Sequence, residues 1–314
     1  MTPMKATREA WGETLRELGE RDPRIVVLDA DLSKSTMTAL FAKAHPKRFF
    51  NMGIAECNMV GVAAGLSLAG FIPFLSTFAI FASGRAWEQV RNTLGYTHLN
   101  VKIGGSHAGL TVGEDGASHQ ALEDLALMRV IPGMTVVAPA DATETGLAVR
   151  AAADHQGPVY VRYGRPKVPV LFGPDHAFAL GKGHVLRKGS GLLLLGTGLG
   201  TQLIVEALPT LVARGLDPWA IHLATVKPLD REVLLYAAGR SKAVVTVEEH
   251  SIVGGLGGAV AELLCDERPL PLVRLGVADR FGQSGEPDAL LKAYGLTAEG
   301  VVAAAQKALA RATA

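Results

Sequence analysis

The sequence predicts an α/β protein of two domains, each an open parallel or mixed sheet covered by helices. Segments of strand type alternate with segments of helical periodicity, which is typical of parallel sheets with helices on both faces. The length of 314 residues suits two domains. Apolar residues make up 48% of the chain and charged residues 19%, so buried cores are expected and disordered or fibrous classes are excluded.

The first domain is expected over residues 1–165. A helix at 7–19 leads into the strand IVVLDA at 25–30, whose apolar run suits a central parallel strand. The elements expected next are a helix at 56–69, a strand at 71–75, a helix at 83–94, a strand at 100–105, a helix at 119–128, a strand at 134–140, a helix at 143–153 and a strand at 158–164. Prolines and glycines crowd residues 166–188, which predicts a linker there.

The second domain is expected over residues 189–314, with the same alternation. Its elements are a strand at 191–198, a helix ending near 214, a strand at 218–224, a helix at 230–238, a strand at 242–249, a helix at 257–264 and a strand at 271–277. Open sheets of this kind bind ligands at the carboxyl ends of their strands. The loops after the strands are therefore where a site is expected.

Charge and cysteine content exclude further classes of protein. The chain has 31 basic and 30 acidic side chains, so no overall field favours nucleic acid or an anionic membrane. Its two cysteines are too few for a disulfide framework or a four-ligand zinc site, which suggests a reducing cytoplasm. The charged start of the chain is unlike an export signal. The 28 uncharged residues between Glu56 and Arg85 are interrupted by Gly70 and Pro73, so we expect a buried helix, strand and loop rather than a membrane span.

Two segments in the first half carry candidate functional residues. Glu56 begins an otherwise apolar helix, where a carboxylate can also simply stabilise the positive end of the helix dipole. Gly61 and Gly65 share one face of this helix and allow close packing. Phe78 and Phe81 follow a strand, either as core residues or as a surface for a flat heteroaromatic ring.

The segment GGSHAGLTVGEDGASHQ holds His107, Glu114, Asp115 and His119 among glycines. One interpretation is a solvated loop whose Ser118 caps a helix. The alternative is acid–base chemistry, because histidine titrates near neutrality. Their spacing fits none of the usual zinc patterns, and no metal ligand is expected in this chain.

Arginines and glycine runs offer weaker signals. Arg162 and Arg165 end a strand and Arg8 lies near the amino terminus; each is either solvated or suited to phosphate. GTGLGT at 196–201 departs from the dinucleotide fingerprint and favours a tight turn. The glycines of EEHSIVGGLGG favour a turn or interface over an anion site.

Taken in order, GIAE, TFAIF, VGEDGASHQ, APADATE, TVKPLD and EEHSIVGGLGG resemble the carboxyl-terminal half of the transketolase family of thiamine diphosphate enzymes. The resemblance covers nearly the whole chain. It implies a pyrimidine-binding domain followed by the transketolase carboxyl-terminal domain. No GDG with a suitably spaced Asn is found, and GEDG at Gly113 lies in another context. The resemblance therefore implies the smaller subunit of a split transketolase.

The resemblance also implies roles for individual residues. Glu56 matches the glutamate that hydrogen-bonds N1′ of the cofactor aminopyrimidine, and Phe78 and Phe81 match its aromatic pocket. Gly84 stands where many relatives have a tyrosine, so one ring contact is missing or comes from elsewhere. His119 matches a catalytic position near the reacting carbons, and His107, a further catalytic candidate, matches a position that lines the substrate channel. The other matches are Asp115 at a substrate hydroxyl, Asp31 near the cofactor, and Arg8, Ser35, His107 and Arg162 at the sugar phosphate.

The implied activity is transfer of a two-carbon ketol unit between sugar phosphates in the pentose phosphate pathway. A separate subunit would hold the diphosphate and Mg²⁺ or Ca²⁺, and self-association through the pyrimidine-binding domain would give an α2β2 heterotetramer. No nucleic acid or membrane partner is expected. The alternatives are a 1-deoxyxylulose-5-phosphate synthase, the beta subunit of an oxo-acid dehydrogenase, and a non-catalytic assembly subunit.

Overall fold

The computed structural model describes residues 3–313. Strands of the first half of the chain, joined by β12 from the second half, form a seven-stranded sheet in the order β12-β6-β7-β5-β4-β2-β3, in which only the β12–β6 pair is antiparallel. Its elements are α1 (Thr7–Arg21), β2 (Ile25–Asp29), α2 (Ser33–Thr36), α3 (Ala39–Ala44), β3 (Phe49–Asn51), α4 (Glu56–Leu68), β4 (Ile72–Phe78), α5 (Trp87–Gln89), β5 (Lys102–Ser106), α6 (Asp124–Arg129), β6 (Thr135–Val137), α7 (Ala142–Asp154), β7 (Val159–Arg162) and β12 (Thr225–Lys227).

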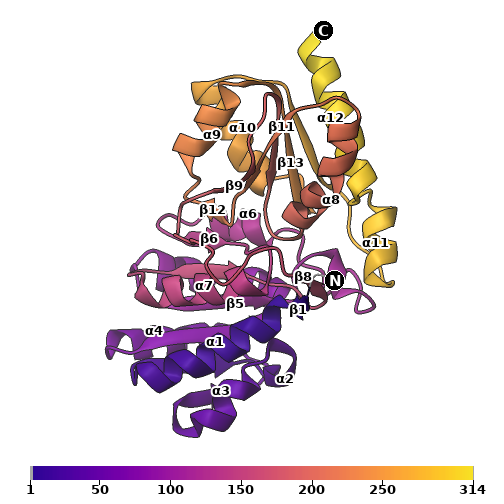
Figure 1. Cartoon of the computed structure of the whole chain (residues 1–314). Helices are drawn as coiled ribbons and strands as arrows, with labels where there is room; N and C mark the ends of the chain where they lie inside the picture. The colour runs from indigo at the N-terminus through magenta and orange to yellow at the C-terminus, as the bar shows by residue number, and fades with distance from the viewer. Residues whose placement is uncertain (1–2, 314) are drawn as a thin grey trace.

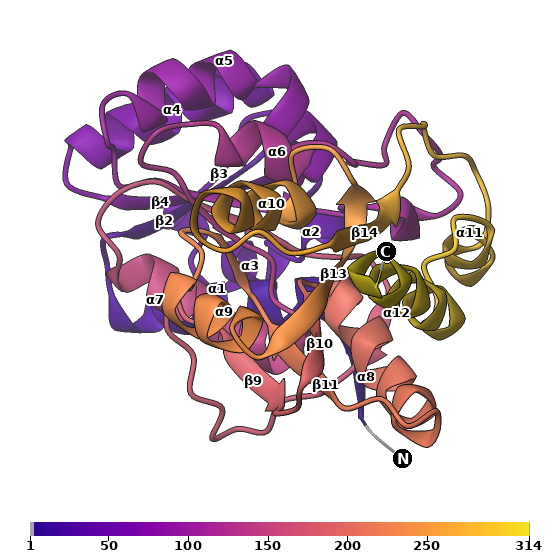
Figure 2. The same cartoon turned by 90° about the horizontal axis from the view of Figure 1, so that it is seen from above.

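Helices cover both faces of this sheet because its central strands are apolar on both sides. In β2, Val26 and Leu28 join a core beneath α4 and α6, while Ile25 and Val27 join a second core beneath α1, α3 and α7. Figure 2 shows α4 on one side of β2 and β4, with α1 and α7 on the other. The continuous apolar run at 25–29 is thus explained by burial on two faces.

The second half forms a five-stranded sheet in the order β14-β13-β10-β11-β9, which is parallel except for the β9–β11 pair. It lies above the first sheet in Figure 1. Its elements are β9 (His184–Arg187), β10 (Gly191–Gly196), α8 (Leu199–Ala213), β11 (Pro218–His222), α9 (Arg231–Ala238), β13 (Ser241–Ser251), α10 (Leu256–Glu267), β14 (Leu272–Val277), α11 (Pro287–Ala293) and α12 (Ala298–Thr313). The two mixed sheets confirm the predicted fold class.

Several local predictions were wrong. The expected helix at 83–94 is interrupted: π-helical turns at Phe81–Arg85 and Val90–Gly95 flank α5. The expected helix at 119–128 begins only at Asp124, so Ser118 is not its cap. The stretch at 166–188 contains β8 (Lys167–Pro169), which pairs with β1 (Met4–Ala6), as well as β9. Strands this short show no readable periodicity, and their existence depends on distant partners.

The two glycine runs of the second half make close backbone contacts. A methyl group at Gly200 would overlap the carbonyl oxygen of Val247, so α8 can begin against β13 only with glycine there. At the start of α10, the amides of Leu256 and Gly257 donate to the buried carboxylate of Glu248 at 2.7 and 2.8 Å. The anion at this helix N-terminus is therefore the protein's own side chain.

A buried polar cluster joins the two halves of the chain. The Glu144 carboxylate on α7 lies 2.7 Å from Nε2 of His222 on β11 and 3.3 Å from Nε2 of His176. The Thr201 hydroxyl lies 2.6 Å from Nδ1 of His222. Burial acts to raise the pKa of Glu144, but the charge of His222 and the hydrogen bonds from both histidines and the Ala140 amide lower it to about 2. Glu144 is therefore ionised, and it fixes the second half of the chain to the first.

Candidate active site

The predicted site residues gather at the carboxyl ends of the central strands of the seven-stranded sheet. Asp31 follows β2, Phe78 ends β4, and His107 follows β5. Neighbouring parallel strands end at the same edge of a sheet, so loops that are distant in sequence meet there. The segment that carries Asp115 and His119 follows β5, so it also starts at this edge.

The rings of Phe78, Phe81, His107 and His119 form one cluster at this edge, the ring cluster. The rings of Phe78 and Phe81 lie 9° from parallel, with centroids 5.9 Å apart. His107 stacks on Phe78 at 4.1 Å. His119 meets Phe81 edge-on at 5.5 Å and Phe78 at 6.2 Å. The structure thus brings together two predicted cofactor residues and two predicted catalytic histidines.

His107 is held in an unusual conformation and a dry environment. Its φ of +55° lies in the left-handed region, which for a non-glycine residue is uncommon and marks strain that recurs at functional sites. The Ser106 hydroxyl lies 2.7 Å from Nδ1. Burial, together with the positive charges of Arg8 and Arg165, lowers the pKa of His107 to about 3. The imidazole is therefore neutral near pH 7 and can accept or donate one hydrogen bond.

Glu56 is the first residue of α4 and is only 1% exposed. The positive end of a helix favours a carboxylate at this position. Nη1 of Arg85 lies 2.8 Å from one carboxylate oxygen of Glu56 and 2.9 Å from the other. The same guanidinium covers the ring of Phe81, with its carbon 4.6 Å from the centroid. One cation therefore contacts both a buried carboxylate and an aromatic surface.

Arg85 is a site residue that sequence reasoning missed. The signal was present, because Glu56 and Arg85 are the two charges that bound the 28-residue uncharged stretch. A buried carboxylate needs a partner, and a lone cation after a long apolar stretch is a natural candidate.

Arg8 and Ser35, both predicted to hold the sugar phosphate, are in contact. Nη1 of Arg8 donates to the carbonyl oxygen of Ser35 at 3.1 Å. Nε of Arg8 is buried and has no partner among residues 3–313. Asp31 is exposed, with φ +63°, and accepts a hydrogen bond from Asn51 at 3.0 Å. Asp31 lies in the short loop between β2 and α2, and Ser35 lies in α2 itself.

That loop is organised by Asp29, a second residue that sequence reasoning missed. Its buried carboxylate accepts hydrogen bonds from the amide of Leu32 at 2.6 Å and the hydroxyls of Thr36 and Thr38 at 2.7 and 2.8 Å. Burial raises the pKa of Asp29, although these hydrogen bonds oppose the shift. The carboxylate fixes the turn that carries Ser35.

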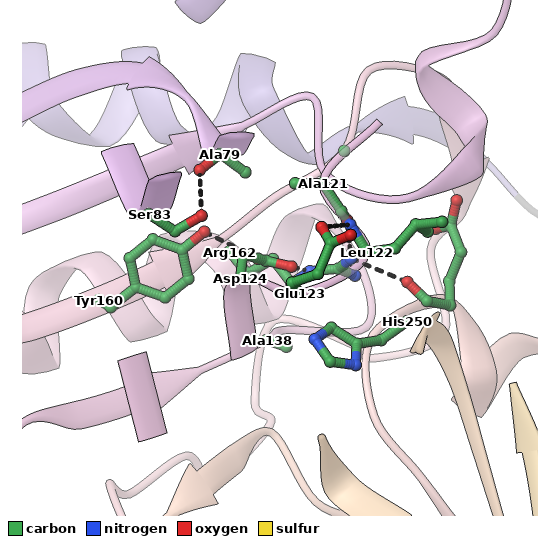
Figure 3. A network of polar contacts seen from close by, with 12 residues as sticks. Ala79, Ser83, Ala121, Leu122, Glu123, Asp124, Ala138, Tyr160, Arg162 and His250 are labelled. Carbon is green, nitrogen blue, oxygen red and sulfur yellow. Dashed lines mark hydrogen bonds and ion pairs between the residues drawn. The ribbon is translucent and has the colours of Figure 1, made fainter. Parts of the chain in front are cut away.

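Arg162 lies in a different environment from the one expected of a phosphate ligand. It is 7% exposed, and its Nε donates to the carboxylate of Asp124 at 2.9 Å (Figure 3). Its Nη2 donates to the carbonyl oxygens of Ala121 and Glu249 at 3.2 and 2.8 Å, and the Tyr160 hydroxyl donates to the same Asp124 oxygen at 2.8 Å. Arg162 therefore joins α6 to the second sheet instead of reaching the ring cluster.

Arg165, three residues later, reaches outward. Its side chain is 38% exposed, and Nη1 lies 2.9 Å from the carboxylate of Glu114. Nη1 also donates to the carbonyl oxygen of Val112 at 2.5 Å, and the positive charge of Arg165 contributes to the lowered pKa of His107. Asp115 is exposed in the same loop as Glu114. Arg85 is thus a cation in contact with the ring cluster, while Arg8 and Arg165 act on His107 through their charges.

Two further properties of the described part of the chain bear on function. Within residues 3–313, no group of three or more His, Cys, Asp or Glu side chains is arranged to bind a metal ion. Over the same range, no helix is both long and apolar enough to cross a bilayer.

Comparisons with known proteins agree on one family. The family described as "Transketolase, pyrimidine binding domain" matches residues 4–170, and "Transketolase, C-terminal domain" matches residues 181–301. A "Putative transketolase C-terminal section" of Methanocaldococcus jannaschii is 49% identical, covering 95% of this chain and 94% of the relative. The "6-deoxy-6-sulfo-D-fructose transketolase subunit SqwH" of a Clostridium species is 40% identical, covering 97% of this chain and 94% of the relative.

A solved structure is similar along almost its whole length. The protein described as "Split gene transketolase, inactive beta4 tetramer" superimposes with a TM-score of 0.91 at 57% identity, covering 97% of this chain and 98% of that one. The two family matches, the order of the two sheets and the site at the edge of the first sheet are consistent with one another. The chain belongs to the transketolase family, of which it contains the pyrimidine-binding and carboxyl-terminal domains.

Proposed function

We propose that this chain is the smaller subunit of a split transketolase that transfers a two-carbon ketol unit between sugar phosphates. The observation that carries the proposal is the buried carboxylate of Glu56, which Arg85 links to the ring of Phe81, itself parallel to the ring of Phe78. A buried acid beside stacked aromatic faces suits a flat ring that has both a π-face and a ring nitrogen. Two close relatives of similar length carry names of transketolase sections or subunits.

The donor set fits the aminopyrimidine end of thiamine diphosphate. Glu56 would hold the proton shared with N1′, Phe78 and Phe81 would pack on the ring, and Asp31 would lie near the cofactor. When bound, the cofactor supplies a carbon nucleophile and an electron sink for the transferred unit. We assign the diphosphate and its Mg²⁺ or Ca²⁺ to a partner subunit.

Substrate handling follows from the charges around the ring cluster. Arg8 and Arg165 would hold the sugar phosphate, with Ser35 beside Arg8. His107 is neutral near pH 7 and can hydrogen-bond a hydroxyl or carbonyl oxygen without repelling these cations. His119, at the edge of both phenylalanine rings, is placed to move a proton at the reacting carbons. Asp115 would contact a substrate hydroxyl. Arg162 is committed to its buried ion pair and is omitted from the phosphate site.

Assembly is part of the proposal. The outer face of α4 exposes Gly61 and Gly65, and no atom of this chain lies within 4 Å of a Cβ built on either. Ile54, just before that helix, and Leu68, its last residue, are 78% and 77% exposed. A smooth uncharged helix face suits close packing against a second copy, which supports an α2β2 heterotetramer.

We place this enzyme in the cytoplasm and in the pentose phosphate pathway, whose chemistry is this transfer.

Reconstitution tests the function. The purified chain alone should be inactive with ketose and aldose phosphates, and activity should appear when a diphosphate-binding subunit and thiamine diphosphate are added. Glu56→Gln in that complex should lower kcat by about 10²- to 10⁴-fold, the usual range for loss of a proton-transfer group. Full activity of the isolated chain, or unchanged kcat in the variant, would refute the proposal. Release of CO₂ from pyruvate with glyceraldehyde 3-phosphate would instead identify a deoxyxylulose phosphate synthase.

A further inference from the structure

The contacts of Arg85 conflict with the role given to Glu56. Both carboxylate oxygens of Glu56 accept from Nη1 of Arg85, at 2.8 and 2.9 Å. Glu56 is 1% exposed, so a ring nitrogen has no second open route to this carboxylate. The face of Phe81 beneath the guanidinium is covered as well. The two groups assigned to the aminopyrimidine are thus already engaged by one side chain of the chain itself.

We propose that Arg85 is a built-in stand-in for the cofactor's aminopyrimidine, which occupies Glu56 and Phe81 until the cofactor displaces it. This inference rests on the proposed function. A guanidinium and a protonated aminopyrimidine share the features that matter: both are flat, both donate N–H groups to a carboxylate, and both stack on aromatic faces. A buried carboxylate without a partner is costly, so a subunit that waits for its cofactor needs such a cation.

The local structure allows Arg85 to leave. Its side chain is 49% exposed, so the guanidinium can move into solvent without being buried elsewhere. It ends a π-helical turn, a distortion often found at functional sites. Gly84 precedes it, is exposed, and has no atom within 4 Å of where its Cβ would lie. Gly84 therefore leaves open space beside the arginine, where a larger side chain would stand in its way.

Competition for Glu56 predicts that removing Arg85 tightens cofactor binding. In the reconstituted complex, calorimetric titration with thiamine diphosphate and Mg²⁺ should give a Kd about three- to tenfold lower for Arg85→Met, the loss of a half-exposed ion pair. Arg85→Gln, which keeps a donor without the charge, should shift the Kd in the same direction by less. Arg91→Met, at an exposed arginine bonded to Asn92, is the matched control and should leave the Kd unchanged.

A second readout needs no cofactor. In urea unfolding of the isolated subunit, Arg85→Met should lower the unfolding midpoint. In a Glu56→Gln background, Arg85→Met should lower neither the unfolding midpoint of the subunit nor the Kd of the complex for thiamine diphosphate. An unchanged or higher Kd in Arg85→Met would overturn the inference, because Arg85 would then be a bystander or a permanent wall of the pocket. If the wild-type complex itself binds no thiamine diphosphate, the proposed function fails first, and the two failures are told apart by that measurement.

Discussion

Arg162 and Arg165 lie three residues apart, and the structure assigns them opposite roles that mutation can separate. Arg162 is 7% exposed and Asp124 is fully buried, with 2.9 Å between Nε and the carboxylate. Removing one member of a buried pair leaves the other charge without a partner, which costs about 3–5 kcal/mol. Against a total stability of about 5–15 kcal/mol, Arg162→Met should lose about a fifth or more of the free energy of unfolding.

The double variant shows that this loss comes from the pair. Arg162→Met with Asp124→Asn removes both charges, and the amide oxygen of the new asparagine still accepts the Tyr160 hydroxyl now bonded to Asp124. We therefore expect the double variant to recover part of the stability lost in Arg162→Met. Urea midpoints of the isolated chain measure these differences, with Arg91→Met as a surface control.

Kinetics of the reconstituted complex complete the test. Arg165→Met should raise KM for the phosphorylated substrate about 10- to 100-fold, because a charge-assisted contact contributes about 1.5–3 kcal/mol. Its unfolding midpoint should change little, since the Arg165–Glu114 pair is largely exposed. Folded Arg162→Met should keep KM within about twofold of the wild type. A large KM increase in Arg162→Met without loss of stability would refute our reading and restore Arg162 as a phosphate ligand.

Two further predictions concern acid stability and assembly. The pKa of Glu144 is about 2 in the folded chain against an ordinary 4.5, so its contribution to stability is fully present above pH 4.5 and is lost as the pH falls from 4.5 to 2. This contribution amounts to about 3 kcal/mol. Urea midpoints measured from pH 2 to 6 should therefore vary less with pH in Glu144→Gln than in the wild type. An equal pH dependence of the midpoint in both proteins would contradict the lowered pKa of Glu144. Gly61→Ala should stabilise the isolated chain by about 0.5–1 kcal/mol, because the helix face is open and alanine favours helix. Gly61→Arg should weaken self-association in sedimentation velocity, and an unchanged oligomer would remove α4 from the interface.

The arrangement of the major elements could be predicted from the sequence. Apolar runs such as the one at 25–29 identify central parallel strands, and helical segments between them imply helices on both faces. The predicted candidates Glu56, Phe78, Phe81, His107 and His119 all fall at one edge of the first sheet. Their catalytic and binding roles remain predictions, as do the domain boundaries at 165 and 188.

Elements that depend on distant partners could not be predicted. The strands β8, β9 and β12 have three or four residues each and exist because β1, β11 and β6 lie beside them. The helix expected at 83–94 failed because its hydrophobic pattern is compatible with π-helical turns, whose extra residue per turn is set by packing against neighbouring elements.

The amino-acid sequence by itself determined the fold class, the order of the major strands and helices as far as β14, and the loops that carry chemistry, because periodicity and turn residues are local properties of the chain. The helices α11 and α12 were not predicted. Only the tertiary structure decided which charges meet. It paired Glu56 with Arg85 across 28 uncharged residues, buried Arg162 against Asp124, and paired Arg165 with Glu114. The partner of a side chain depends on which elements pack together, and that is a long-range outcome of folding which local patterns do not contain.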